Sequence, residues 1–283
     1  MKAFFKGFGL TSLFALSVVK GNSSSSIIHS ILQNARADNI DLTVLPFLND
    51  SLDSIVETYA NANNTSKRQG NGTIIDTHAH VVPDWYRAIQ PTTGGNPTPS
   101  WDLTNWLSFL DTEGIGRAIF SFSAPSANVF PTNKTLTIAL ARLMNEHLHA
   151  ISLAVPNQLQ FYAHVPLPYA DEAIVEAKYA VEKLGAVGFF LTSNFEDNYL
   201  GNEALRPFLA ALDGMEKRQI VYVHPTTPVM KDFPYAPSFT QAGSLAAIQG
   251  SDLLSGDDKT KLFTTNAEGL FGETSAGGGP RRR

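Results

Sequence analysis

The chain has 283 residues with a formal net charge of -5, and 43% of its residues are hydrophobic. This is enough apolar material for one large buried core or two small ones. The acidic balance argues against a nucleic-acid or anionic-membrane surface, because both need a concentrated basic face. Cysteine is absent, which excludes disulfides, thiolate metal sites and cysteine nucleophiles and leaves His, Asp and Glu for metal or acid–base chemistry.

The first residues have the pattern of a secretory signal. Lys2 and Lys6 precede the apolar run "GFGLTSLFALSVV", which is too short to span a bilayer but has the length of a signal-peptide core. We therefore expect a signal peptide over residues 1–21, with a frayed terminal helix as the alternative. Sequons for N-glycosylation begin at Asn22, Asn49, Asn63, Asn64, Asn71 and Asn133. These features predict a secreted glycoprotein, and a cytoplasmic protein is the alternative.

Two polar segments flank the predicted globular domain at residues 73–272. Residues 22–72 are rich in Ser and Asn and contain the dibasic pair Lys67–Arg68 near their end. A dibasic pair ahead of a compact domain in a secreted protein predicts a removable pro-segment, and an exposed linker is the alternative. The Gly-rich stretch "SAGGGP" precedes Arg281–Arg283, so residues 273–283 are expected to be a disordered tail.

From residue 73 onward, strand and helix patterns alternate. The apolar runs predict strands at residues 72–80, 117–123, 159–168, 186–195 and 220–225, and the 3.6-residue periodicity predicts helices at 101–114, 134–155, 171–185 and 202–219. Asp102 is the expected N-cap of the first of these helices. Further helices are expected at 243–254 and 255–271. This alternation predicts an α/β fold with a parallel sheet of the (β/α) barrel type.

The barrel predicted by these elements is incomplete. The fifth strand is followed by "TTPVMKDFPYAPSF", which has no helix for a parallel crossover. Residues 73–272 also fall short of the roughly 250 residues of a full eight-unit barrel. The sequence therefore predicts an incomplete TIM-like (β/α) barrel of about five to six βα units.

The stretch "DTHAHVVP" is the strongest sign of chemistry. Two histidines two apart on a strand, His78 and His80, face the same side and can reach one ion at the end of the strand where barrel enzymes place their sites. His224 ends the fifth predicted strand at the same rim. Asp232 would complete a set of three histidines and one carboxylate, which suits zinc or another divalent ion.

Other residues are candidates for the pocket wall. Trp85 and Arg87 offer a stacking surface and a carboxylate partner, and Gly94 and Gly95 permit tight backbone geometry near a ligand. His164 lies on the third predicted strand and is expected to line the pocket as a substrate contact. His147 and His149 diverge around a helix axis and cannot share an ion.

Several motifs together resemble the amidohydrolase-related decarboxylases, the aminocarboxymuconate-semialdehyde decarboxylase-like family with its fungal members of the 6-methylsalicylate decarboxylase type. The motifs that carry the resemblance are "DTHAHVVPDWYR", "GGNPTPSWDLTNWLSFLDTEGI", "GAVGFFLTSNFEDNYLGNEALRPFLAAL", "VYVHPTTP" and "DFPYAPSF". They span residues 73 to about 272 in the family's order. The resemblance implies a barrel of the metal-dependent hydrolase superfamily.

The resemblance also implies a ligand set. His78 and His80 match the first-strand ligands, His224 the fifth-strand ligand and Asp232 the eighth-strand aspartate. The family's sixth-strand histidine, which acts in proton transfer, has no counterpart here. The chain thus passes from the fifth-strand motif directly into the eighth-strand motif near residues 229–232, as a skipped exon, a mis-spliced transcript or a wrong gene model would produce.

The function implied by the resemblance is non-oxidative decarboxylation of an aromatic or enoic carboxylic acid such as 6-methylsalicylate. His224 and Asp232 are the expected catalytic residues, and zinc is the expected cofactor, with manganese as the alternative. A metal-dependent amidohydrolase or lactonase and an inactive truncated product are the other hypotheses. The expected partners are a small carboxylic acid and a second copy of the chain in a homodimer, without nucleic acid or a membrane span.

Overall fold

The computed structural model describes residues 23–65, 70, 72–90, 98–196, 198–224, 249–250 and 255–272. Several sequence predictions lie outside these residues: the signal peptide, the Lys67–Arg68 pair, Gly94, Gly95, Asp232, the junction at 229–232 and the C-terminal tail. The helix predicted at residues 243–254 lies largely outside the described residues, and the sequons at Asn22 and Asn71 begin outside them.

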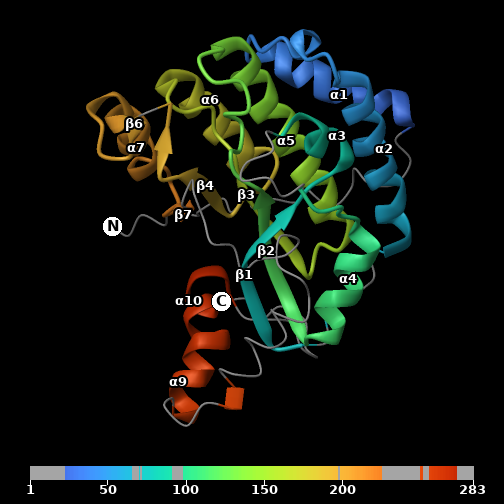
Figure 1. Cartoon of the computed structure of the whole chain (residues 1–283), viewed down its shortest axis with the longest axis vertical. Helices are drawn as coiled ribbons and strands as arrows, with labels where there is room; N and C mark the ends of the chain where they lie inside the picture. The colour runs from blue at the N-terminus through green and yellow to red at the C-terminus, as the bar shows by residue number, and fades with distance from the viewer. Residues whose placement is uncertain are drawn as a thin grey trace, which may run out of the picture.

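A sheet of parallel strands lies at the centre of the molecule (Figure 1). Its strands are β1 (Ile74–Val81), β2 (Ile115–Phe122), β3 (Leu159–Ala163), β4 (Gly188–Thr192) and β7 (Ile220–His224), hydrogen-bonded in that order. Every neighbouring pair is parallel. Each strand overlaps a predicted one, and β1 and β7 are the two edges of the sheet within the described residues. The prediction of an incomplete (β/α) barrel is confirmed.

Helices connect the strands, as parallel crossovers require. The connecting elements are α3 (Asp84–Ile89), α4 (Leu103–Thr112), α5 (Lys134–Ala154), α6 (Ala170–Glu182), η2 (Glu203–Leu205) and α7 (Arg206–Asp213), and a small antiparallel ribbon is formed by β5 (Asn194–Phe195) and β6 (Asn198–Tyr199). The Asp102 side chain accepts a hydrogen bond from the Asn105 backbone N–H, which confirms the predicted cap of α4. Within the described part of the chain, no helix has the length and apolar character needed to cross a membrane.

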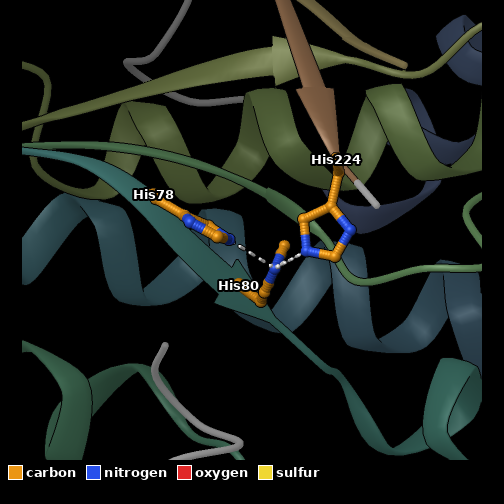
Figure 2. A group of neighbouring side chains, drawn as sticks. All are labelled: His78, His80 and His224. Atoms are coloured by element: carbon orange, nitrogen blue, oxygen red, sulfur yellow. Dashed lines mark hydrogen bonds between the residues drawn. The ribbon is translucent and has the colours of Figure 1, made fainter. Parts of the chain in front are cut away.

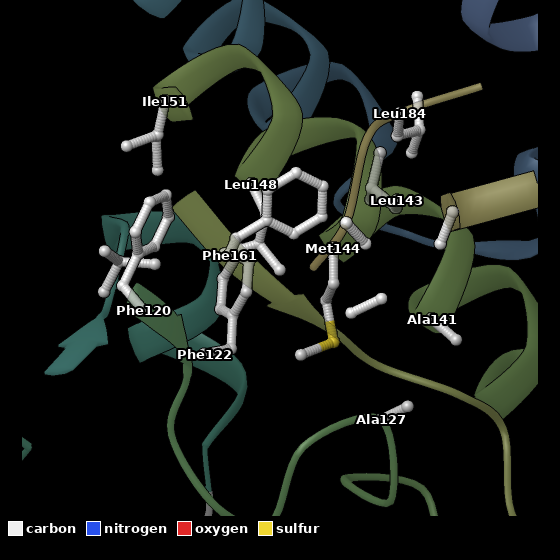
Figure 3. Packing of buried hydrophobic residues seen from close by; sticks show 14 of the residues in the cluster. Phe120, Phe122, Ala127, Ala141, Leu143, Met144, Leu148, Ile151, Phe161 and Leu184 are labelled. Atoms are coloured by element: carbon white, nitrogen blue, oxygen red, sulfur yellow. The ribbon is translucent and has the colours of Figure 1, made fainter. Parts of the chain in front are cut away.

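Alternate strand residues face outward and form the main hydrophobic core. Phe120 and Phe122 of β2 are fully buried in the same cluster as Leu148 and Ile151 of α5, and Figure 3 shows these side chains packed together. The outer face of β7 differs, because Val221 and Val223 are 40% and 47% exposed. In a complete barrel, helices cover the outward-facing strand residues. The described helices therefore leave part of the barrel's outer surface open at β7.

The other face of the sheet is the inner side of the barrel. Tyr162 and Phe190 are part of a separate buried cluster there, against which Phe271 packs. Phe271 ends α10 (Asn266–Phe271), which follows α9 (Gly256–Thr260) and the π-helical turn η3 (Lys261–Thr265). Figure 1 shows α10 and α4 on opposite sides of β1 and β2. The Arg117 guanidinium donates to the carbonyl oxygens of Phe271 and Gly272, at 2.8 and 2.6 Å. The C-terminal helices thus cover part of the inner face.

Helices α1 (Ser24–Ala37) and α2 (Leu48–Thr65) pack on the outside of the barrel, with the 3-10 turn η1 (Leu42–Val44) between them (Figure 1). Their buried residues Ile31 and Ile55 belong to the same hydrophobic cluster as the buried face of α5. This packing corrects the alternative of an exposed linker at residues 22–72, because the folded layer begins well before residue 73. Removal of the segment by proteolysis stays a prediction.

A buried polar network fixes α1 to α5 and α6. The Arg142 side chain is fully buried and donates from Nε to Glu176 at 2.8 Å and from Nη2 to Asp38 at 2.6 Å. Its guanidinium also lies 3.6 Å from the centre of the Tyr179 ring. Burial acts to lower the pKa of Arg142, but the charge of Glu176 and the hydrogen bonds to Asp38 and Glu176 raise it overall. Arg142 is therefore a permanent buried cation that ties Asp38, at the end of α1, to the barrel.

The same network contains a carboxyl group with a shifted pKa. Burial raises the pKa of Glu146 from 4.5 to about 7, although the hydrogen bond from Tyr179 and the charge of Arg142 act to lower it and the charge of Glu176 raises it further. Between about pH 4.5 and 7, Glu146 is protonated in the folded protein, whereas in the unfolded chain it has lost its proton. The unfolding free energy contributed by this group is therefore highest below about pH 4.5 and falls as the pH rises toward 7.

Glu146→Gln is expected to remove this pH dependence. The unfolding free energy of the wild type should fall relative to that of the variant by up to about 3 kcal/mol between pH 4.5 and 7. Burial lowers the pKa values of His147 and His164 to about 3, so these two residues reduce the unfolding free energy as the pH falls below about 6.5. Because this effect is opposite to that of Glu146, the wild type has to be compared with the variant. Urea unfolding of both proteins at several pH values measures the difference. A constant difference across this range would contradict the assignment.

Candidate metal centre

Three histidines meet at the ends of the two edge strands. His78 and His80 lie near the end of β1, and His224 is the last residue of β7. The β1–β2 register shifts between Asp76 and Ala79, and the Asp76 carboxylate accepts a hydrogen bond from the His78 backbone N–H at 2.9 Å. Figure 2 shows the three imidazoles turned toward one another. The sheet thus brings residues about 145 positions apart in the chain to one point, His80 and His224 being separated by 144.

The geometry of the three rings fits a metal ion. The Nε2 atoms of His78 and His80 are 3.2 Å apart, and those of His80 and His224 are 3.4 Å apart. One ring nitrogen of each residue lies within 4.8 Å of the others. Nitrogen ligands about 2.0–2.1 Å from a tetrahedral zinc ion are separated by about 3.4 Å. Among the described residues, no other group of three or more histidine or carboxylate side chains lies close enough to share an ion.

The ligand group lies against an apolar wall. His80 and His224 are fully buried and His78 is partly exposed. The Phe190 ring, on the inner side of β4, has its centre 5.8 Å from that of His80 and 5.1 Å from that of His224. Such a wall limits the rotation of both imidazoles and keeps water from that side of the group.

Two predicted pocket residues have other roles in the structure. Trp85 is 6% exposed, its indole N–H donates to His147 Nδ1 at 2.9 Å, and it stacks on Phe47. This corrects the expectation that Trp85 offers a stacking surface to a substrate, because both its ring and its donor are used in the core. Arg87 is exposed and forms an ion pair with Asp84 at 2.7 Å. These side chains do not meet the three histidines.

His164 is hydrogen-bonded through both ring nitrogens to the end of β2 and the segment that follows it. Its Nε2 accepts from the Phe122 backbone N–H at 2.9 Å, and its Nδ1 lies 2.5 Å from Ser126 Oγ. Burial, assisted by nearby His80, lowers the pKa of His164 to about 3, so the ring is neutral at physiological pH. With both nitrogens engaged, His164 holds the segment after β2 in place. This corrects its predicted role as a substrate contact.

Sequence reasoning missed residues that contact the histidines, among them Phe190, Ser121 and Tyr222. The ring centre of Tyr222 is 5.0 Å from that of His78. Phe190 packs against His80 and His224, and Ser121 Oγ lies 3.3 Å from His80 Nδ1. The inward-facing alternation of the strands was the available signal. Ser121 is the Cα partner of His80 in the parallel ladder, but this register follows from the structure and not from the sequence pattern.

Comparison with known proteins decides the family. The family model described as amidohydrolase matches residues 75–250. The chain belongs to the amidohydrolase family. A solved crystal structure of an amidohydrolase II shares the fold, with a TM-score of 0.64, 20% sequence identity and coverage of 70% of this chain and 99% of that one.

Two curated fungal relatives of this amidohydrolase-family chain are decarboxylases. It is 32% identical over 161 residues to Decarboxylase yanB of Aspergillus niger, covering 54% of this chain and 43% of the relative. It is 35% identical over 163 residues to the 6-methylsalicylic acid decarboxylase of Penicillium expansum, covering 55% and 49%. The chain thus matches about half the length of these relatives.

Proposed function

We propose that this chain is a metal-dependent, non-oxidative decarboxylase of aromatic carboxylic acids similar to 6-methylsalicylate. The observation that carries the proposal is the convergence of His78, His80 and His224 at the carboxyl ends of parallel strands, which is where barrel enzymes place their sites. Membership of the amidohydrolase family and the names of the two curated relatives support the choice of decarboxylation.

Zinc is the proposed ion, and manganese is the alternative. Imidazole nitrogens suit zinc, whereas manganese favours oxygen ligands. A bound divalent cation would supply a Lewis acid that holds the substrate's carboxylate and adjacent phenolic oxygen and stabilises the charge developing as CO₂ leaves. The three imidazoles would hold the ion through their Nε2 atoms, and Phe190 shields one side of the group. Asp232 is proposed as the fourth ligand.

The reaction needs one proton on the ring carbon that loses CO₂. His164 is neutral with both nitrogens engaged, so it is a poor source of this proton. His224 and Asp232 stay the proposed catalytic residues, His224 by holding the ion at the reacting group and Asp232 by acting with a water molecule as proton donor. The substrate-facing roles of Gly94 and Gly95 stay predictions.

The test is an assay of the purified, zinc-loaded full chain. With 6-methylsalicylate as substrate, decarboxylation yields CO₂ and 3-methylphenol in equal amounts, which chromatography and CO₂ capture can quantify together. A set of aryl lactones and amides, assayed in parallel, tests the amidohydrolase or lactonase alternative. Ring opening without CO₂ release would replace the proposal by that alternative.

One observation favours the hypothesis of an inactive truncated product. Val221 and Val223 leave the outer face of β7 exposed, where a longer barrel would place covering elements. Under this hypothesis, the protein retains zinc but releases no product from any substrate of the set. Sequencing of the genomic DNA between the codons for Val229 and Asp232 complements the assay, since an intervening coding segment would identify the chain as an incomplete copy of a longer enzyme.

Secretion and a homodimer are also part of the proposal. Asn49 and Asn133, both in sequons, are exposed in the structure, which is compatible with glycosylation there. Glycosidase treatment of the protein from a eukaryotic culture medium should increase its electrophoretic mobility, and light scattering should give twice the chain mass. An intracellular, unmodified monomer would contradict secretion, glycosylation and dimerisation, but it would not contradict the proposed metal site.

A further inference from the structure

His80 is the central member of the three-histidine group. Its Nε2 atom lies 3.2 Å from that of His78 and 3.4 Å from that of His224. A histidine can bind a metal through Nε2 only when that atom carries a lone pair, so the proton of the neutral ring must be on Nδ1. The partner of Nδ1 therefore decides whether His80 is ready to act as a ligand.

Ser121 is that partner. It lies on the inner face of β2 as the Cα partner of His80 in the parallel ladder, and its Oγ is 3.3 Å from His80 Nδ1. Both residues are buried, Ser121 being 2% exposed and His80 fully enclosed, so bulk water is excluded as a ready substitute. A hydroxyl oxygen can accept the Nδ1–H proton, whereas a methyl group in its place cannot.

The ring of His80 is also confined on its other side. The Phe190 ring is nearly perpendicular to it, at 80° and a centre distance of 5.8 Å. Packing of this kind restricts rotation but does not choose between the two nitrogens as the site of the proton. A hydrogen bond from Nδ1–H to the Ser121 hydroxyl favours the proton on Nδ1.

We propose that Ser121 is a positioning residue of the metal centre, which holds His80 in the Nδ1–H tautomer and so directs its Nε2 lone pair at the ion. This inference rests on the proposed function for the presence of the metal. Partners of this kind behind a ligating histidine typically contribute about 10- to 100-fold to metal affinity. Ser121 contributes no ligand of its own in this arrangement.

Three substitutions test the proposal in the full chain. Ser121→Ala should weaken zinc binding by about 10- to 100-fold, measured by competition with a chelating dye. Ser121→Thr keeps the hydroxyl and should restore affinity to within a few-fold. The matched control is Ser123→Ala, which removes an equally buried hydroxyl that accepts from Gln90 Nε2 at 2.5 Å. This control should bind zinc as the wild type does.

A tautomer measurement tests the inference without any metal. Nitrogen-15 NMR of histidine-labelled, metal-free wild type should show His80 protonated at Nδ1, and Ser121→Ala should shift the ring toward protonation at Nε2. Thermal unfolding of each variant reports whether it is folded. Should Ser121→Ala fail to fold, the wild-type tautomer and the Ser121→Thr affinity decide the matter.

Two results would overturn the inference: wild-type His80 protonated at Nε2, or Ser121→Ala binding zinc no more weakly than Ser123→Ala does. A wild-type protein that binds no zinc would instead overturn the proposed metal-dependent function. The tautomer of His80 would still test the role of Ser121 in that case, so the two failures are distinguishable.

Discussion

His224→Ala is expected to abolish retention of zinc and, with it, decarboxylase activity. His224 is the member of the three-histidine group that comes from β7, and its loss leaves His78 and His80, both from β1, as the described ligands. If the three imidazoles share a binding free energy of roughly 10 kcal/mol, the loss of one weakens binding by a factor on the order of 100 to 1,000. Elemental analysis after dialysis measures the zinc content per chain.

The control for this experiment is His29→Ala. His29 lies on α1 and is exposed, so its removal should change neither the zinc content nor the rate of product formation. A His224→Ala protein that keeps one zinc per chain would show that the ion is held elsewhere. Equal zinc loss in both variants would point to a nonspecific effect on the preparation.

Arg142→Ala is expected to lower the unfolding free energy by about 3–5 kcal/mol, because it leaves Glu176 buried without its cation. The substitution also removes the ion pair to Asp38 and the contact with the Tyr179 ring, both of which join α1 to the barrel. Urea denaturation followed by circular dichroism measures the change in the midpoint.

The matched control is Arg206→Ala. Arg206 pairs with Glu203 at 2.7 Å, close to the Arg142–Glu176 distance of 2.8 Å, but both side chains of this pair are about three-quarters exposed. Exposed pairs contribute about 0–1 kcal/mol, so this variant should unfold close to the wild type. Comparable losses from the two substitutions would contradict the importance of burial for the Arg142 network.

The sequence was sufficient for the frame of the fold and for the three histidines. Strand and helix periodicity differ enough to reveal the alternating units. His78 and His80 lie at the end of one predicted strand and His224 near the end of another, which places them at one rim of a parallel sheet. Those inferences depend on local sequence patterns and on the rule that the carboxyl ends of parallel barrel strands lie at the same rim. The sequence also predicts no crossover helix directly after residue 225, and that prediction lies outside the residues that the structure describes.

The environment of each polar side chain could not be predicted in this way. Trp85 and His164 are residue types that are common in pockets. In the structure, however, Trp85 packs in the core and His164 is hydrogen-bonded to the end of β2. Arg142 lies in the middle of a helix whose pattern does not show that Asp38, from a distant weakly amphipathic segment, will reach it. Such contacts depend on tertiary packing, which the local periodicity of the sequence does not reveal.

The covering of the inner face by α10 has a consequence for the order in which the chain can fold. The hydrogen bonds from Arg117 to Phe271 and Gly272 join residues 154 and 155 positions apart. Contacts between such distant residues close late, because the intervening chain must lose its freedom first. During synthesis, Tyr162 and Phe190 therefore stay uncovered by Phe271 until α10 has emerged. In that interval, the inner aromatic surface is exposed, and transiently exposed apolar surface of this kind favours aggregation unless a chaperone binds it.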